Sequence, residues 1–148
     1  WRIGYTAGNN KVIKAMAKLQ GQSTSCPNSI AQAAAIEALI GDQTQVKTMK
    51  NIFKNRRDYI IKRLNNMKDV HCTVPGGAFY AFPDFSKHMN KNISSSNDLA
   101  MYLLEKKSVV SVSGDAFGGA GHIRFSYAAS DVDLQGAMDL LEEALDEI

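Results

Sequence analysis

The sequence has few of the residues that build metal sites or disulfide scaffolds. It contains 2 cysteines and 3 histidines in 148 residues. Cys26 and Cys72 match no metal motif and are too few for a disulfide framework, so a reducing, cytoplasmic setting is expected. His71, His88 and His122 are scattered, and none has metal-ligand spacing from a cysteine or a carboxylate. The sequence therefore predicts no metal ion.

Long apolar runs are missing as well. No stretch approaches the roughly 20 residues that span a bilayer, and no signal peptide is visible. We therefore expect no membrane partner. Apolar residues make up 45% and charged residues 22% of the chain. These values are close to globular averages and exclude disordered, collagen-like and low-complexity proteins. A chain of this length can bury about two-thirds of its unfolded surface, which is enough for a core.

Charge is unevenly distributed around the net value of +2. The balance is +8 for residues 1–74 and −6 for residues 75–148, and the positive charge gathers in residues 47–68, where 8 basic residues accompany one acid, Asp58. A basic helix can bind nucleic acid. The stretch has no DNA-binding motif and lacks the interleaved aromatics of a single-strand binder, so we favour a solvated helix face and expect no nucleic-acid partner.

Periodicity and capping residues predict an α/β protein with helices layered on a small sheet. Gly41 and Asp42 predict a helix end followed directly by a long helix, and Ser95 and Ser130, each three residues before an Asp, predict the N-caps of two later helices. The segment from Gln20 to Ser25 is expected to be irregular. Helices are expected at 11–19, 29–40, 43–68, 97–107 and 131–147, and strands at 2–7, 70–74, 78–83, 109–112 and 122–128.

Two arginines, Arg2 and Arg124, lie between apolar neighbours in expected strands. An arginine in such a position often points outward into solvent. A guanidinium also remains charged and can hold a carboxylate or a phosphate through two parallel hydrogen bonds, so both interpretations stand. The glycine-rich segment Gly114–Gly121 fits neither the phosphate-loop nor the dinucleotide-binding pattern, which favours a flexible turn.

Four segments in order carry a resemblance that covers essentially the whole chain. They are Trp1-Arg2-Ile3-Gly4-Tyr5, the run from Gln22 to Gln32 (QSTSCPNSIAQ), Pro75-Gly76-Gly77-Ala78-Phe79-Tyr80, and the run from Val109 to Ala128 with its His122-Ile123-Arg124-Phe125-Ser126-Tyr127. Together they resemble the bacterial subgroup of class I aminotransferases, pyridoxal 5'-phosphate (PLP) enzymes of the aspartate aminotransferase group.

The resemblance implies roles for single residues. Arg2 would bind the phosphate of PLP, and Arg124 would bind the α-carboxylate of the amino-acid or 2-oxo-acid substrate. The Gln22–Asn28 loop would lie near the active site and the partner subunit. Ser113 stands where the family commonly has proline, a departure that affects the rigidity expected of this loop. The lysine that forms the Schiff base in the family would fall shortly before Trp1, so no catalytic residue is expected in this chain.

The same resemblance implies a fold and a function. We expect the C-terminal small domain of a fold-type I PLP-dependent transferase plus the last strand and helices of its large domain, as a C-terminal fragment of a longer, cytoplasmic, homodimeric enzyme. Residues 1–42 would end the large cofactor-binding domain, 43–68 would form a bridging helix, and 69–148 would form the small α/β domain.

The expected reaction transfers an amino group, foremost between aspartate and 2-oxoglutarate. Aromatic and prephenate-type substrates remain open, and the fragment alone would be inactive. The alternatives are a non-enzymatic dimerisation or regulatory domain and a nucleic-acid-binding module on 47–68.

Overall fold

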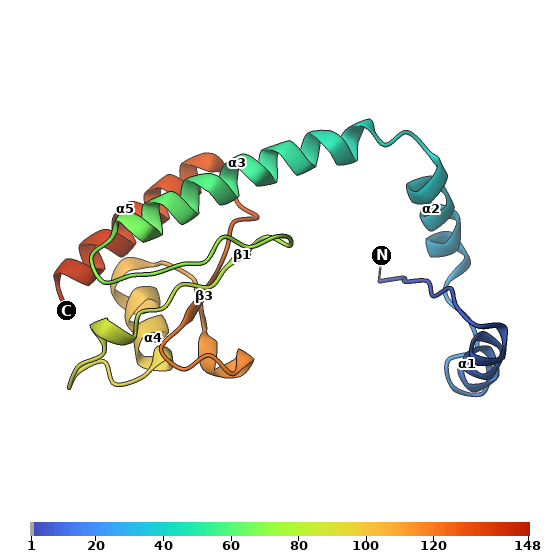
Figure 1. Ribbon diagram of the computed structural model, residues 1–148, viewed down its shortest axis with the longest axis horizontal. Helices are drawn as coiled ribbons and strands as arrows, with labels where there is room; N and C mark the ends of the chain where they lie inside the picture. Colours follow the sequence, from blue (N-terminus) through green and yellow to red (C-terminus); the bar gives the residue numbers. More distant parts are fainter. Residues whose placement is uncertain (1) are drawn as a thin grey trace. The chain divides into compact units, whose positions relative to one another are not determined.

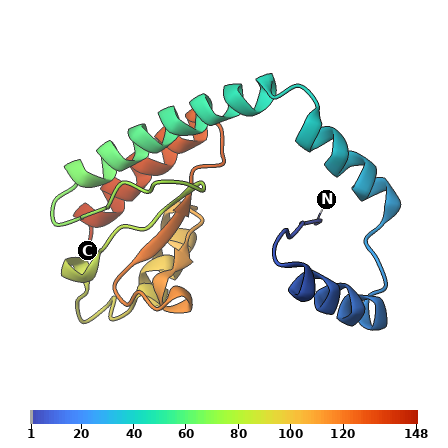
Figure 2. The same cartoon turned by 45° about the vertical axis from the view of Figure 1, so that its right-hand side comes forward.

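The computed structural model describes residues 2–148, so Trp1 of the Trp1–Tyr5 motif lies outside the described residues. The chain divides into two compact units, of which unit 1 ends at Lys47 and unit 2 runs from Thr48 to Ile148. Figures 1 and 2 show the ribbon from two directions. The helices are α1 (Asn10–Ser23), α2 (Ser29–Ile40), α3 (Thr44–Asn66), α4 (Ser96–Lys107) and α5 (Asp131–Asp146), with short 3-10 helices η1 (Ser86–His88) and η2 (Gly114–Phe117); the strands are β1 (Tyr80–Ala81), β2 (Val112–Ser113) and β3 (Ile123–Ser126).

Unit 1 consists of two capped helices with very little core. The side chains of Asn9 and Asn28 accept backbone N–H groups in the first turns of α1 and α2, which satisfies donors that a helix start leaves unpaired. Of the residues described in this unit, Ala31 alone is a buried hydrophobic residue. Large apolar side chains are open instead, among them Tyr5 (79% exposed) and Ile40 (80% exposed). Unit 1 therefore buries little apolar surface by itself.

Two expectations for unit 1 are wrong. Residues 2–7 form no strand, and Arg2 has a φ of 60°, outside the strand region. A strand needs a neighbouring strand to pair its N–H and C=O groups, and this segment has none among the described residues. The segment from Gln20 to Ser25 is not irregular throughout, because α1 continues to Ser23 and the Thr24 N–H still donates to the Gln20 carbonyl at 3.0 Å.

The core of unit 2 lies between its helices and its sheet. In both views α3 and α5 run side by side (Figures 1 and 2). Helical spacing brings one apolar stripe of each helix into the core, which in α3 includes Ile60 and Leu64. The buried cluster includes Ile60, Ile61 and Leu64 of α3, Leu99 and Leu103 of α4, Leu134, Met138 and Leu141 of α5, and Ile123 and Phe125 of β3.

Ion pairs between α3 and α5 explain much of the uneven charge along the sequence. The Arg56 Nε lies 2.7 Å from a carboxylate oxygen of Asp131. The Arg63 guanidinium reaches Asp139 at 2.8 Å and Glu142 at 3.1 Å, and these carboxylates raise the pKa of Arg63, the hydrogen bond to Asp139 most of all. The basic helix and the acidic C-terminal helix therefore neutralise one another along their shared face.

The sheet of unit 2 is small and antiparallel, in the order β1-β3-β2. Its strands are shorter than the sequence pattern suggests, and the strand expected at 109–112 is wrong for residues 109–111, because β2 comprises Val112–Ser113. The expected strand at 70–74 is reduced to a single bridge, in which His71 pairs with Asp84. The two predicted N-caps are confirmed, because a cap depends on local hydrogen bonds. The hydroxyls of Ser95 and Ser130 each accept the backbone N–H of the Asp three residues later, at 3.1 Å.

Candidate carboxylate-binding site

Arg124 occupies the middle of β3, at the centre of the three-stranded sheet. Its direct neighbour on β2 is Val112, and Ser126, two residues further along β3 and on the same face, pairs with Tyr80 of β1. Tyr80 is therefore the diagonal neighbour of Arg124, within reach of a long side chain. The guanidinium carbon of Arg124 lies over the Tyr80 ring, 4.4 Å from its centroid, and over the Phe117 ring, 4.3 Å from its centroid.

The guanidinium of Arg124 has aromatic contacts but no anionic partner within residues 2–148. Its side chain is half-buried, and among the described residues no carboxylate forms an ion pair with it. A cation–π contact depends on the charge of the guanidinium and forms no N–H···O hydrogen bond, so the two rings leave its donors free for an oxygen ligand. The N–H edge therefore remains able to bind a carboxylate or a phosphate through two parallel hydrogen bonds.

The glycine-rich segment holds Phe117 in place rather than acting as the flexible turn that its pattern favours. A Cβ on Gly114 would lie 2.3 Å from the Gly119 carbonyl oxygen and 2.5 Å from the His122 carbonyl oxygen. A Cβ on Gly119 would lie 2.7 Å from the Phe82 ring. The loop folds back so tightly because these two positions carry no side chain. It brings η2, with Phe117 at its end, next to β3.

Ser113 begins η2 in a way that replaces the proline expected at this position. Its φ of −53° lies in the range that proline would impose. Its hydroxyl accepts the Asp115 N–H at 3.3 Å and lies 3.0 Å from the Asp115 carboxylate. The turn is therefore fixed by a side-chain cap instead of a pyrrolidine ring.

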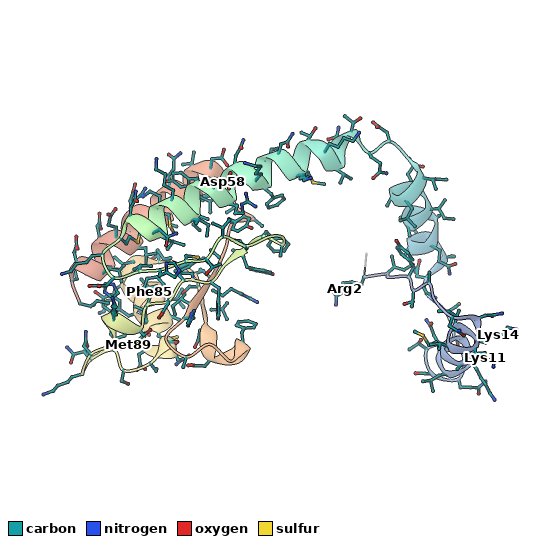
Figure 3. The ribbon with its side chains drawn as sticks, viewed as in Figure 1. Arg2, Lys11, Lys14, Asp58, Phe85 and Met89 are labelled. Atoms are coloured by element: carbon teal, nitrogen blue, oxygen red, sulfur yellow. The ribbon has the colours of Figure 1, made fainter. Side chains whose placement is uncertain are left out.

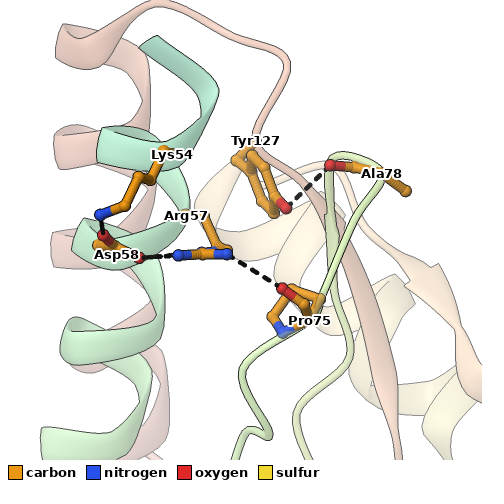
Figure 4. Close-up of polar contacts among 6 residues, drawn as sticks. All are labelled: Lys54, Arg57, Asp58, Pro75, Ala78 and Tyr127. Carbon is orange, nitrogen blue, oxygen red and sulfur yellow. Dashed lines mark hydrogen bonds and ion pairs between the residues drawn. The ribbon is translucent and has the colours of Figure 1, made fainter. Parts of the chain in front are cut away.

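The turn before β1, which leads to Tyr80, is anchored at both ends. Arg57 of α3 donates to the Pro75 carbonyl at 3.3 Å, and the buried Tyr127 donates its hydroxyl hydrogen to the Ala78 carbonyl at 3.1 Å (Figure 4). Ala78 has a φ of 58°, a conformation that a residue other than glycine keeps only when its surroundings hold it. These bonds therefore fix where β1 starts.

Asp84 lies beside the site, between two histidines. It forms single antiparallel bridges with His71 on one side and His122 on the other, and His122 stacks on the Phe82 ring. The pKa of Asp84 is lowered, first because the Ser86 hydroxyl and N–H donate to its carboxylate and then because His122 and His71 contribute positive charge. Asp84 therefore helps to hold the segment that follows β1.

The lowered pKa of Asp84 predicts a change in acid stability. A carboxyl group whose folded pKa lies below its unfolded value stabilises the fold above the unfolded value, about 3.9, and this contribution is lost as the pH falls through the folded pKa. We expect Asp84→Asn to lower the free energy of unfolding near neutral pH, and we expect this difference to shrink from about pH 4 downward and to vanish below the folded pKa of Asp84. Urea unfolding across this range measures the difference. Asp146→Asn, at the end of α5, is the control, and parallel curves for Asp84→Asn and the wild type would contradict the assignment.

Arg2, the second arginine singled out by the sequence, lies in unit 1 on the extended segment before α1. Its side chain is exposed and forms no ion pair within the described residues. Lys11 and Lys14 project from α1, away from Arg2 (Figure 3). The arrangement leaves Arg2 able to hold a phosphate and does not bring either lysine to it.

Half of the 8 basic residues at 47–68 form ion pairs within the described part of the chain. Lys54 and Arg57 pair with Asp58, each at 2.7 Å, and Arg56 and Arg63 pair with α5 as described above. Residues 2–148 contain no cluster of three or more His, Cys, Asp or Glu side chains placed to hold a metal ion. None of the helices in this described part is both long and apolar enough to cross a membrane.

Sequence reasoning identified Arg124 but missed its aromatic neighbours. Tyr80 lies 44 positions before it, and Phe117 belongs to a loop that the pattern favours as flexible. The available signal was a lone aromatic residue between glycines, placed just before a strand that carries an arginine. That signal alone does not say which ring meets the cation.

Comparison with solved structures defines the class of fold. The crystal structure of the aspartate aminotransferase from Rhizobium meliloti superposes with a TM-score of 0.90 at 41% identity, over 99% of this chain and 38% of that chain. Such neighbours are fold-type I aminotransferases, and the mixed helix and sheet of this chain agrees with that class.

The sequence comparisons give the family. The model of aminotransferase class I and II matches residues 1–141. The aspartate aminotransferase of Rhizobium meliloti (strain 1021) is 41% identical over 154 residues, which cover 100% of this chain and 38% of that protein. The aspartate/prephenate aminotransferase of Nitrosomonas europaea is 42% identical, over 100% of this chain and 37% of that protein. The chain belongs to the class I and II aminotransferase family, and it spans less than two-fifths of the length of these relatives.

Proposed function

We propose that this chain forms part of a PLP-dependent aminotransferase, in which it supplies the arginine that binds the substrate carboxylate. The observation that carries the proposal is the Arg124 guanidinium, held over two aromatic rings on the central strand and without an anionic partner in residues 2–148. The relatives are named aspartate or aspartate/prephenate aminotransferases. Aspartate and 2-oxoglutarate are therefore the first substrates to test. Prephenate is the 2-oxo acid to test next as the acceptor of the amino group.

Arg124 would bind the α-carboxylate that amino-acid and 2-oxo-acid substrates share. Two parallel hydrogen bonds from a planar guanidinium fix both the position and the rotation of a carboxylate. Fixing the carboxylate leaves the Cα–H bond only rotation about the bond between Cα and the carboxylate carbon, which favours proton transfer from that carbon. The role of Arg124 is thus to bind and orient the substrate, and it takes up no proton.

Arg2 would hold the phosphate of PLP. An exposed guanidinium without an internal ion pair suits a phosphate dianion, so this residue fits the cofactor. When bound, PLP supplies the electron sink that stabilises negative charge at the substrate Cα. Lys11 and Lys14 lie on α1, apart from Arg2, and we propose that the lysine that holds the cofactor belongs to the enzyme outside these 148 residues.

The domain organisation is part of the same proposal. Residues 1–42 would complete the large cofactor-binding domain, 43–68 would bridge the domains, and 69–148 would form the small domain of a cytoplasmic homodimer. The open apolar side chains of unit 1, such as Tyr5 and Ile40, support this assignment, because a surface of this kind gains stability when a further domain covers it.

The assay that tests the proposed function compares the enzyme that contains this chain with the 148-residue chain alone. The enzyme, supplied with PLP, is expected to convert aspartate and 2-oxoglutarate into oxaloacetate and glutamate, whereas the chain alone is expected to give no product. Turnover by the chain alone would overturn the claim that the cofactor lysine lies elsewhere. An enzyme that binds dicarboxylates but transfers no amino group to any 2-oxo acid would support a regulatory domain instead.

A further inference from the structure

Two aromatic rings from different elements meet at the guanidinium of Arg124. Tyr80 comes from β1 and Phe117 from the end of η2, and each ring centroid lies within 4.4 Å of the guanidinium carbon. An arginine side chain has many rotamers, most of which would direct its N–H edge away from a given ligand. A cation over an aromatic face is attracted by the negative charge of the ring. Two such contacts restrict the position of the guanidinium.

We propose that Tyr80 and Phe117 are positioning residues for the proposed carboxylate site. They hold the guanidinium of Arg124 in place, so that its N–H groups are available to the substrate before the substrate arrives. This inference rests on the proposed function for the identity of the ligand. The two rings are given no contact with the substrate and act through Arg124.

The position of Phe117 is fixed by packing against neighbouring rings. The Phe117 ring meets the Phe82 ring edge-on, with centroids 6.3 Å apart and an interplanar angle of 89°. Phe82 in turn occupies the space that a Cβ at Gly119 would need, and it stacks on His122 at 4.9 Å. Phe117 is therefore backed by a ring that is itself held from two sides.

The support behind Tyr80 comes from its own strand. The Tyr80 ring packs against the Phe79 ring, with centroids 4.5 Å apart. The Tyr127 N–H donates to the Phe79 carbonyl at 2.9 Å, directly before the paired residues of β1 and β3. The two rings thus reach Arg124 from different elements, Tyr80 from β1 and Phe117 from the end of η2.

A first experiment tests the geometry without any activity. In the 148-residue chain, the Nε–Hε proton of Arg124 is expected to resonate upfield of other arginines, because ring currents from Tyr80 and Phe117 shield it. Phe117→Leu and Tyr80→Leu should each move the signal toward the position of an exposed arginine, whereas Phe117→Tyr and Tyr80→Phe should keep it. An unshifted wild-type signal would overturn the proposal whether or not the enzyme transaminates.

A second experiment tests the consequence for binding in the enzyme that contains this chain. Removal of one ring, in Phe117→Leu or Tyr80→Leu, is expected to raise KM for aspartate and for 2-oxoglutarate about 3- to 10-fold with kcat nearly unchanged, as expected for loss of one cation–π contact. The single substitutions Phe117→Tyr and Tyr80→Phe, which keep an aromatic ring, should leave KM close to the wild-type value. A fall in kcat without a rise in KM, or a comparable rise in KM in the ring-retaining variants, would overturn the positioning role. If the wild-type enzyme transfers no amino group, the proposed function fails while the resonance experiment still decides the geometry.

Discussion

Replacing Arg124 with alanine, in the enzyme that contains this chain, is expected to lower kcat/KM about 30- to 5,000-fold for both aspartate and 2-oxoglutarate. This range corresponds to about 2–5 kcal/mol, the usual loss when one partner of a hydrogen-bonded charge pair is truncated. The effect should extend to monocarboxylate substrates, because the α-carboxylate is common to all of them. Arg124→Lys should recover only part of the loss, since an ammonium cannot form the two parallel bonds of a guanidinium.

The matched control for this prediction is Arg56→Ala. Arg56 is also a partly exposed arginine of unit 2, but it pairs with Asp131 of α5. Its removal should leave KM for both substrates unchanged while it costs at most about 1 kcal/mol of stability. Steady-state kinetics on both variants give the comparison. Unchanged kcat and KM in Arg124→Ala would remove Arg124 from the substrate site.

Gly114→Ala is expected to cause the largest loss of stability among the loop glycines, about 3 kcal/mol in the free energy of unfolding. The new Cβ would lie 2.3 Å from the Gly119 carbonyl oxygen and 2.5 Å from that of His122. These oxygens cannot easily move away, because the Gly114 N–H donates to the His122 carbonyl at 2.8 Å and the His122 N–H donates to the Gly119 carbonyl at 3.1 Å. The substitution should therefore separate η2 from β3 and displace Phe117.

Gly76→Ala provides the control for Gly114→Ala. Nothing lies within 4 Å of a Cβ built on Gly76, and its φ is not positive, so its replacement should change the free energy of unfolding by less than about 0.5 kcal/mol. Gly118, with a φ of +73° and no close neighbour, should fall between the two, at about 1 kcal/mol. Urea unfolding of the three variants ranks them. A Gly114→Ala protein as stable as Gly76→Ala would show that the loop has room to relax.

Features fixed by local chemistry could be predicted from the sequence. The caps at Ser95 and Ser130 depend on a hydroxyl and an N–H three residues apart, and both are confirmed. The long helix after Asp42 is confirmed as the 23 residues of α3, because its apolar spacing is sustained. The strand expected at residues 2–7 is wrong, since a strand depends on a partner that the pattern of one segment cannot reveal.

The candidate site, too, could be predicted from the sequence only in part. Arg124 could be selected because a charged residue between apolar neighbours is visible in the sequence, and the resemblance suggested a role for it. The rings over it could not be selected, because β1 meets β3 through sheet pairing between distant segments, and the loop that carries Phe117 folds back only because Gly114 and Gly119 lack side chains. Glycine can give a loop flexibility or permit close packing of two segments, and the sequence alone could not show which of these roles Gly114 and Gly119 have.

The most direct test of the proposed function is the half-reaction with aspartate alone. The enzyme that contains this chain, loaded with PLP and mixed with aspartate in the absence of a 2-oxo acid, is expected to release oxaloacetate in an amount equal to its active sites and then stop. Addition of 2-oxoglutarate should restart the release and yield glutamate, as a ping-pong amino transfer requires. The Arg124→Ala enzyme should need far more aspartate to release the same amount. Absence of oxaloacetate from the wild-type enzyme, or equal release by the Arg124→Ala enzyme at low aspartate, would contradict the account.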